Sequence, residues 1–169
     1  MTLLTWLGRS GPGSNAINSS DPAQVALGRR IYAEQCAQCH GANLEGQPNW
    51  RSRRPDGRLP APPHDALGHT WHHADETLFR IVREGTPAVV VGGYESDMPG
   101  FGNLLSDAEI RAVLSFIKST WPDRERSLQE RQSRIQRDAG NQGGQENSVV
   151  HGQGCSGSLA HKQVPMGIG

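Results

Sequence analysis

Hydrophobic and aromatic residues are scarce in this chain. They make up 34% and 5% of its 169 residues, whereas glycine and proline number 21 and 11. The length predicts one domain of ordinary size with tails. This low hydrophobic content does not exclude folding, because a bound group can complete a small core.

Net charge is absent as well. The 17 Lys and Arg residues balance the 17 Asp and Glu residues, which gives a formal net charge of +0. A neutral chain has no overall attraction to polyanions or to an acidic membrane surface. We therefore expect no nucleic-acid partner.

Cysteine is rare too, but two of the three cysteines form a motif. They lie in the run Cys36-Ala37-Gln38-Cys39-His40, a Cys-x-x-Cys-His sequence typical of c-type haem attachment. Each thiol can add to one haem vinyl group, and His40 is then placed to coordinate the iron from the proximal side. The run predicts covalent haem c, and because no second such run is present, we expect one haem.

Two other interpretations of the cysteine pair are weaker. A thiol-disulfide redox site, as in thioredoxin-like folds, needs a βαβ context that the sequence lacks. A zinc site needs two further ligands at close spacing, and the third cysteine, Cys155, lies far downstream.

Helices are predicted over residues 21–36, 75–84 and 106–120. The first begins at Asp21, an N-cap residue followed by proline. The last begins at Ser106 with a capping box and continues as an apolar stripe at helical spacing. A short apolar run at 88–91 permits a strand, although four residues decide nothing.

Residues 41–63 show no helical or strand period, and five prolines interrupt them. We predict a long loop that wraps one edge of the haem. The loop is basic, since Asp56 is opposed by four arginines: Arg51, Arg53, Arg54 and Arg58. These side chains are either solvated or in contact with haem propionates or an acidic partner.

Two further sets of residues are candidate iron ligands. The first is a group of histidines: His64, His69, His72 and His73. Their spacing is weak evidence for a metal site. The second is Met98, a soft thioether of the kind that pairs with histidine at haem iron. Pro99 restricts the backbone that carries it, and the other methionines are terminal, at Met1 and Met166. The alternative role for Met98 is as a core side chain.

Together these motifs resemble class I cytochrome c over residues 21–122. The resemblance rests on Gly28 and Tyr32, the Cys-x-x-Cys-His run, the proline-rich stretch, Met98-Pro99 and the final amphipathic helix. Among such proteins, the chain is similar to the bacterial monohaem cytochromes of the mono/dihaem group. The resemblance implies an all-α cytochrome c fold, one small helical domain wrapped around a covalently bound haem.

The resemblance also implies details of the haem site. The first and last helices are expected to cross near Gly28 and Phe116. A backbone carbonyl within Pro60–Pro63 is expected to accept the Nδ1–H of His40, which would fix the orientation of this ligand.

The expected function is one-electron transfer, with Cys36 and Cys39 holding the haem and His40 and Met98 as axial ligands of its iron. Because both axial positions are filled, we expect a carrier and not an enzyme, with redox proteins as partners. The alternatives are a haem-bearing subunit of a larger oxidoreductase, and a haem enzyme or sensor with a labile sixth ligand. Covalent attachment of this kind implies export, so we expect a periplasmic chain or one anchored on the outer face of the cytoplasmic membrane.

The flanking segments differ from this domain. The apolar run within residues 1–20 is too short for either a complete signal or a membrane span. We therefore expect this segment to be the remnant of a signal or membrane anchor, followed by a flexible linker. Residues 123–138 are rich in charged side chains, and this pattern predicts an exposed helical extension. From Ala139 to residue 169, glycine and polar residues dominate, so we expect disorder.

Overall fold

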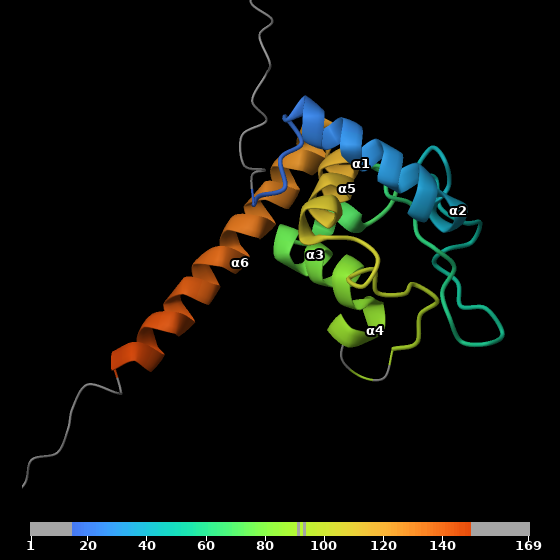
Figure 1. Ribbon diagram of the computed structural model, residues 1–169. Coiled ribbons are helices and arrows are strands. Elements are labelled where there is room, and N and C mark those ends of the chain that lie inside the picture. Colours follow the sequence, from blue (N-terminus) through green and yellow to red (C-terminus); the bar gives the residue numbers. More distant parts are fainter. Residues whose placement is uncertain (1–14, 91, 93, 150–169) are drawn as a thin grey trace, which may run out of the picture. The chain divides into compact units, whose positions relative to one another are not determined.

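The computed structural model describes residues 15–90, 92 and 94–149, with side chains up to residue 142. Contacts divide the chain into two compact units, residues 1–136 and 137–169. The elements (Figure 1) are α1 (Pro22–Gln35), α2 (Ala37–His40), the 3-10 helix η1 (Thr70–His72), α3 (Asp75–Glu84), α4 (Thr86–Val89), α5 (Asp107–Ser119) and α6 (Asp123–Val149). The described part contains helices and loops without a strand, which confirms the predicted all-α fold.

Helix α1 begins where the sequence predicts. The Asp21 carboxylate accepts hydrogen bonds from the backbone N–H groups of Ala23 and Gln24, at 2.9 and 3.3 Å, and Pro22 is the first helical residue. These bonds satisfy N–H groups that the helix itself leaves free. The helix ends at Cys36, whose N–H still donates to the Tyr32 carbonyl, and α2 starts at the next residue.

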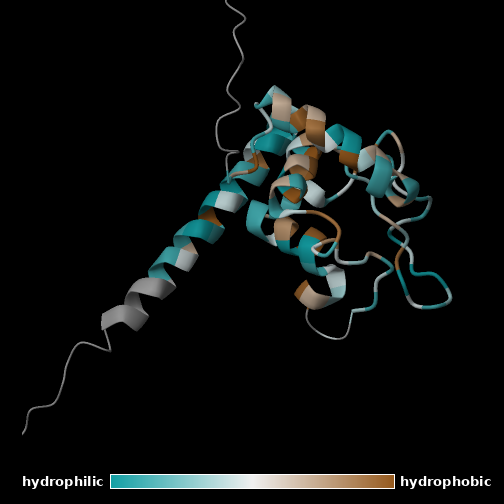
Figure 2. Ribbon diagram, viewed as in Figure 1, coloured by the Kyte–Doolittle hydropathy of each residue, from teal (hydrophilic) through white to brown (hydrophobic). Residues whose placement is uncertain are grey.

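Helix α5 supplies more residues of the core than any other element. Its Ser106 side chain accepts from the Glu109 N–H while the Glu109 carboxylate accepts from the Ser106 N–H, so the predicted capping box is confirmed. Buried residues of α1, α3, α5 and neighbouring loops form one cluster: Ile31, Tyr32, Leu44, Leu78, Phe79, Leu105, Ile110, Val113, Leu114, Phe116, Ile117 and Trp121. In Figure 2 hydrophobic residues gather on α1 and α5.

The two helices cross at Gly28, as the resemblance implies. A Cβ atom at this position would overlap the carbonyl oxygen of Ala112 and would lie 3.0 Å from the Cβ of Phe116. Hydrogen there, in place of a side chain, lets the backbones of α1 and α5 come into contact.

We therefore expect Gly28→Ala to push the helices apart and to lower the free energy of unfolding by about 1–3 kcal/mol, as overpacking does. Urea unfolding of the haem-loaded protein, followed by helical circular dichroism, measures this change. Gly140→Ala is the matched control, because Gly140 is also helical and a Cβ there meets nothing within 4 Å. Equal losses in the two variants would contradict the close approach at Gly28.

Helix α3 agrees with the prediction, but the apolar run that follows it does not form the strand that four residues allowed. Gly85 ends α3 with φ of 88°, a conformation that favours glycine. The chain then forms α4, with Pro87 in its first turn and the Val90 N–H donating to the Thr86 carbonyl at 3.0 Å. Proline suits the first turn of a helix, which explains why a helix begins here.

The described end of the expected linker is attached to the domain. Ile17 packs against the core, and the Asn18 N–H donates to the side chains of Gln24 and Ser115, both at 2.9 Å. The sequence predicts a flexible linker here, whereas these contacts attach Ile17 and Asn18 to α1 and α5. Residues 1–14, with the predicted remnant of a signal or anchor, lie outside the described residues.

The charged extension is helical, as predicted, but one face of it is buried. Glu125, Gln129 and Ser133 are 8%, 0% and 3% exposed. The Ser133 hydroxyl accepts from the Asp75 N–H at 2.9 Å, and the Gln129 amide donates to the Asp75 carboxylate at 2.7 Å. Since α3 begins after Ala74, which has no side-chain cap, the extension supplies the missing cap from elsewhere in the sequence.

Helix α6 continues to Val149, whereas the sequence predicts disorder from Ala139. A helix that packing has already nucleated is extended more easily than a new one is started, which accounts for the difference. Residues 150–169, including Cys155, lie outside the described residues. Within the described residues, every helix is too short or too polar to cross a membrane.

Candidate functional site

The residues of the Cys-x-x-Cys-His run lie on one helical turn. The N–H groups of Cys39 and His40 both donate to the Cys36 carbonyl, at 3.1 and 2.9 Å. Cys36 is half-buried, Cys39 is exposed, and both thiols are free. Two thiols and an imidazole are thus presented by a single turn, as covalent attachment of one haem requires.

The chemistry of Cys36 differs from that of a redox-active thiol. Burial, with a smaller effect from Cys39, raises the pKa of Cys36 to about 11. Catalytic thiols of thioredoxin-like proteins have a lowered pKa, because the thiolate is the nucleophile. The environment of Cys36 therefore does not favour thiol-disulfide exchange.

His40 is held with one ring nitrogen engaged. Its Nδ1–H donates to the Pro62 carbonyl at 2.8 Å, and this confirms the bond that the resemblance implies for the Pro60–Pro63 stretch. Burial lowers the pKa of His40, although the bond to Pro62 acts in the opposite direction. The ring is therefore neutral near pH 7, and Nε2 remains for an iron ion.

The backbone that leaves His40 toward the loop is fixed as well. The Tyr32 hydroxyl donates to the Gly41 carbonyl at 3.0 Å, and the His40 carbonyl accepts from the Gly46 N–H at 2.8 Å. Tyr32 is 2% exposed. These contacts connect α1 to the loop after the motif and make the position of the His40 side chain reproducible.

Met98 lies on the segment between α4 and α5 and is half-buried. Its N–H donates to the Ser96 hydroxyl at 3.1 Å. The segment is attached to the end of α3 directly afterwards, where the Phe101 N–H donates to the Val82 carbonyl at 2.8 Å. Gly100 allows this approach, because a Cβ there would lie 2.7 Å from the carbonyl carbon of Glu84.

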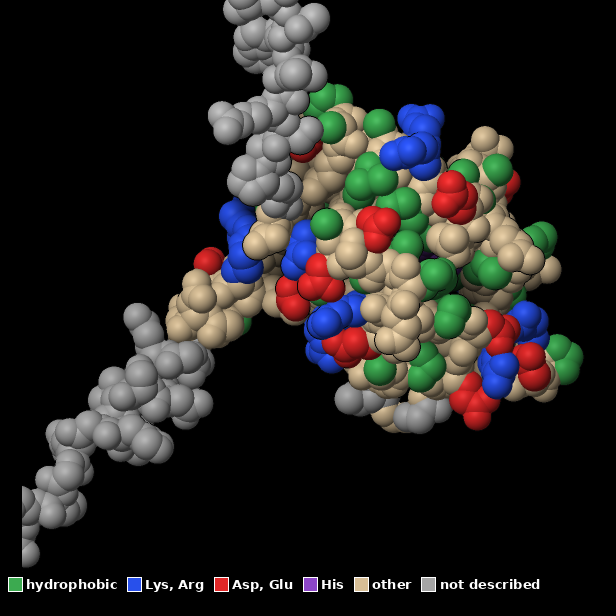
Figure 3. Space-filling model, viewed as in Figure 1, with side chains coloured by type: hydrophobic (Ala, Val, Ile, Leu, Met, Phe, Trp, Pro, Cys, Tyr) green, Lys and Arg blue, Asp and Glu red, His purple; other side chains and the backbone are tan. Residues whose placement is uncertain are grey.

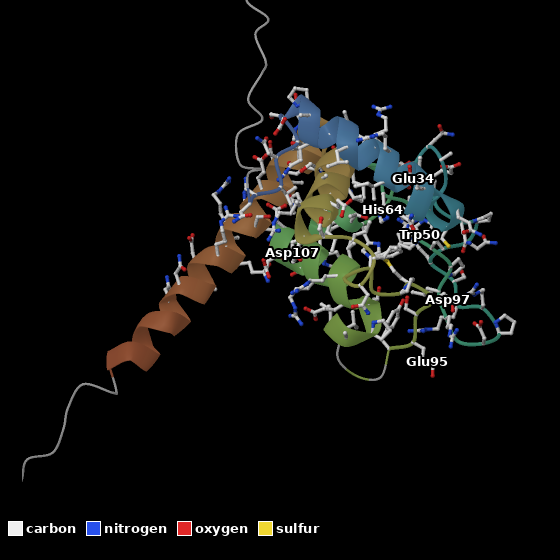
Figure 4. All side chains as sticks on the ribbon, in the orientation of Figure 1. Glu34, Trp50, His64, Glu95, Asp97 and Asp107 are labelled. Carbon is white, nitrogen blue, oxygen red and sulfur yellow. The ribbon has the colours of Figure 1, made fainter. Side chains whose placement is uncertain are left out.

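The segment is attached on its other side to the basic loop. Arg54 and Arg58 both donate to the Asp97 carboxylate, the latter at 2.6 Å, and the guanidinium of Arg58 lies 3.5 Å from the Glu95 carboxylate. Figure 4 labels Asp97 and Glu95 on this segment. Hydrogen bonds from the two arginines lower the pKa of Asp97. Two arginines thus join the long loop to the residue directly before Met98.

This pairing corrects the expectation for the basic loop. The sequence predicts arginines that are solvated, bound to propionates or bound to an acidic partner, and it shows Asp56 as the nearby acid. The structure pairs Arg54 and Arg58 with one acid of this same chain, Asp97, which lies 43 and 39 residues away from them. In Figure 3 acidic and basic side chains also lie next to one another on the visible face.

The four histidines do not form a metal cluster. Among the described residues, no group of three or more His, Cys, Asp and Glu side chains could hold a metal ion. His69 stacks on Trp50 and His72 on Trp71, with ring centroids 5.4 and 3.7 Å apart. His64 stacks on the ring of His40, a contact that sequence reasoning missed because it grouped His64 with the others.

A helical domain that presents two thiols and a carbonyl-bound histidine on one turn fits a covalently attached haem. The sequence profile of the family described as Cytochrome c matches residues 25–121. The chain belongs to the cytochrome c family.

Two curated relatives are similar to part of the chain. Cbb3-type cytochrome c oxidase subunit FixP of Azorhizobium caulinodans is 29% identical over 94 residues, which are 56% of this chain and 28% of that protein. Cbb3-type cytochrome c oxidase subunit CcoP of Rubrivivax gelatinosus is 35% identical over 52 residues, which are 31% of this chain and 17% of that protein. The match thus covers well under half the length of either relative. No solved structure matches this chain significantly.

The family membership settles the cofactor and the general role. The chain carries covalent haem c with iron, and it acts in haem-based electron transfer. The arrangement of Cys36, Cys39 and His40 fits this group, because the two thiols and the imidazole lie on one turn and the bond from His40 Nδ1–H to Pro62 leaves Nε2 free.

Proposed function

We propose that this protein is a one-electron carrier whose iron is bound by His40 and Met98, with Cys36 and Cys39 forming the thioether bonds. The observation that carries the proposal is the hydrogen bond from His40 Nδ1–H to the Pro62 carbonyl, at 2.8 Å. A histidine held in this way has the tautomer and the fixed orientation of a metal ligand. When bound, haem supplies a centre that cycles between Fe(III) and Fe(II).

The residues around Met98 support its role as the second axial ligand. Bonds to the end of α3 and to two arginines hold the segment on both sides, so Met98 is restricted before it binds iron. Pro99 limits its backbone further. A thioether stabilises the reduced state relative to stronger donors and so raises the reduction potential.

With both axial positions filled by side chains, the chain offers no open coordination site, and we infer that it is not an enzyme by itself. Its partners are then redox proteins that give or accept single electrons. The likeness to cbb3-type oxidase subunits favours a second candidate, a haem-bearing subunit of a larger oxidoreductase, in which the same residues would hold the haem. Because covalent haem of this kind is attached outside the cytoplasm, we place the chain on the periplasmic side of the membrane.

Carbon monoxide binding separates a carrier from a haem enzyme or sensor. We expect the reduced protein to bind no carbon monoxide at neutral pH, and we expect a potentiometric titration to follow a reversible one-electron curve. The visible spectrum under carbon monoxide and during the titration measures both. Stoichiometric carbon monoxide binding by the folded wild-type protein would contradict a closed sixth position and favour the sensor interpretation.

A further inference from the structure

His64 has no part in the proposed function, yet its ring lies against the proximal side of the site. The centroids of the His64 and His40 rings are 3.9 Å apart, with 23° between the ring planes. Figure 4 labels His64 near the centre of the domain. The contact covers one face of the imidazole that the proposed function assigns to the iron.

The backbone of His64 is fixed by both of its polar groups. Its N–H donates to the Leu44 carbonyl at 2.8 Å, and its carbonyl accepts from the indole N–H of Trp121 at 2.7 Å. Trp121 is 2% exposed and follows the end of α5. The residue is therefore tied to the loop after the motif and to the end of the main core helix.

The ring of His64 is fixed as well. The Thr70 hydroxyl lies 3.4 Å from the Pro63 carbonyl, to which it donates, so the same oxygen accepts from His64 Nδ1–H at 2.9 Å. Burial lowers the pKa of His64 well below its ordinary value, with a smaller effect from His40. The edge of Tyr32 approaches from another side, with centroids 6.2 Å apart. His64 is thus a ring with little freedom to rotate.

The hydrogen bond to Pro62 and the stacking of His64 restrict His40 in different ways. The bond to the Pro62 carbonyl fixes the direction in which Nδ1–H points, but a single hydrogen bond allows the ring to turn about that line. A flat, immobile ring stacked on its face prevents this rotation. We propose that His64 is a positioning residue that sets the plane of the His40 imidazole, a role that rests on the proposed assignment of His40 as an axial ligand.

Two measurable properties depend on this arrangement. The principal g values of low-spin ferric haem, read by electron paramagnetic resonance, depend on the orientation of the axial ligand planes. The potential depends on the polarity of the surroundings, because Fe(III) carries one more positive charge than Fe(II) and an apolar neighbour stabilises it less. The ring of His64 therefore affects the g values through its shape and the potential through its polarity.

The test compares three variants of the haem-loaded protein. His64→Leu should shift and broaden the g values and raise the potential, so that the ratio of Fe(III) to Fe(II) at a fixed potential falls by about threefold to tenfold, where tenfold is 59 mV. His64→Phe should restore the g values, because it keeps a flat ring, but not the potential. Thr70→Val should change both in the direction of His64→Leu and by less.

His72→Leu is the matched control, because His72 is an exposed histidine of the same stretch that stacks on Trp71 and not on His40. It should leave g values and potential unchanged. Folding of every variant is checked by helical circular dichroism. Wild-type g values in folded His64→Leu would overturn the proposal, and so would a shift of equal size in His72→Leu.

The outcome also separates this inference from the proposed function. If the wild-type ferric protein is not low-spin with the spectrum of histidine and methionine ligation, the proposed function fails before any variant is compared. If the wild-type spectrum is as expected and His64→Leu matches it, the proposed function stands and the role of His64 is wrong.

Discussion

Replacing Met98 with alanine is expected to abolish the weak far-red band of the ferric protein and to convert the haem to a high-spin state. The side chain that we propose as the sixth ligand is then missing, and solvent takes its place. Met98→His should instead stay low-spin but lose potential by a few tenths of a volt, within the range of about 0.8 V over which axial ligands tune haem. Visible spectra and potentiometric titrations measure these changes.

The histidines after the long loop provide the control for this prediction. Changing His69, His72 and His73 together to glutamine should keep the far-red band, because His69 and His72 stack on tryptophans and His73 meets the ring of His69 edge to face. His64 is left unchanged in this variant, since it contacts His40. A triple variant that becomes high-spin while Met98→Ala stays low-spin would show that a histidine, and not Met98, binds the iron.

The second large effect concerns the thioether bonds. The double change Cys36→Ser and Cys39→Ser is expected to leave no haem attached after denaturation, because serine cannot form a thioether. Each single change should remove one of the two bonds and keep the other. Denaturing gel electrophoresis with haem staining detects the covalent product, and absorption of the reduced pyridine complex reports how many vinyl groups have reacted.

Cys155→Ser is the matched control for the cysteine variants. It removes the third thiol of the chain by the same chemical change and should leave the staining undiminished. Covalent haem in the double variant, or its loss in Cys155→Ser, would mean that the attachment residues have been misassigned.

The parts of the fold that the sequence predicts are those specified by neighbouring residues. The Asp21 cap and the Ser106 capping box each involve residues within one turn of helix, so their signals are visible in the sequence. Gly28 was recognised for a related reason, since glycine inside a helix is unfavourable unless another backbone approaches it. The Cys36–His40 motif is likewise visible in the sequence, because all of its residues are neighbours.

The contacts that the sequence did not reveal join residues far apart in the chain. The pairing of Arg54 with Asp97 spans 43 residues, and the cap that Ser133 provides for Asp75 spans 58. Polar side chains such as Gln129 are assigned to the surface by their hydropathy, whereas the structure buries Gln129 and engages its amide nitrogen in hydrogen bonds that no pattern records. The stacking of His64 on His40 is invisible in the sequence for the same reason, because the two residues are remote along the chain.

The crossing of α1 and α5 has a consequence for the order in which the protein matures. Gln24 and Ser115, which are hydrogen-bonded across these helices, lie 91 positions apart. During synthesis or export from the N-terminal end, Cys36 and Cys39 therefore emerge long before the helix that completes the core.

In the closed fold, burial keeps the Cys36 thiol protonated, with a pKa of about 11, and the surrounding helices restrict access to it. On the open chain the thiol is accessible, and its pKa is near the ordinary value of about 8.5, so a larger fraction of it is thiolate. We therefore expect haem to be attached most readily before α5 docks, so that the helix closes on a chain that already carries its cofactor.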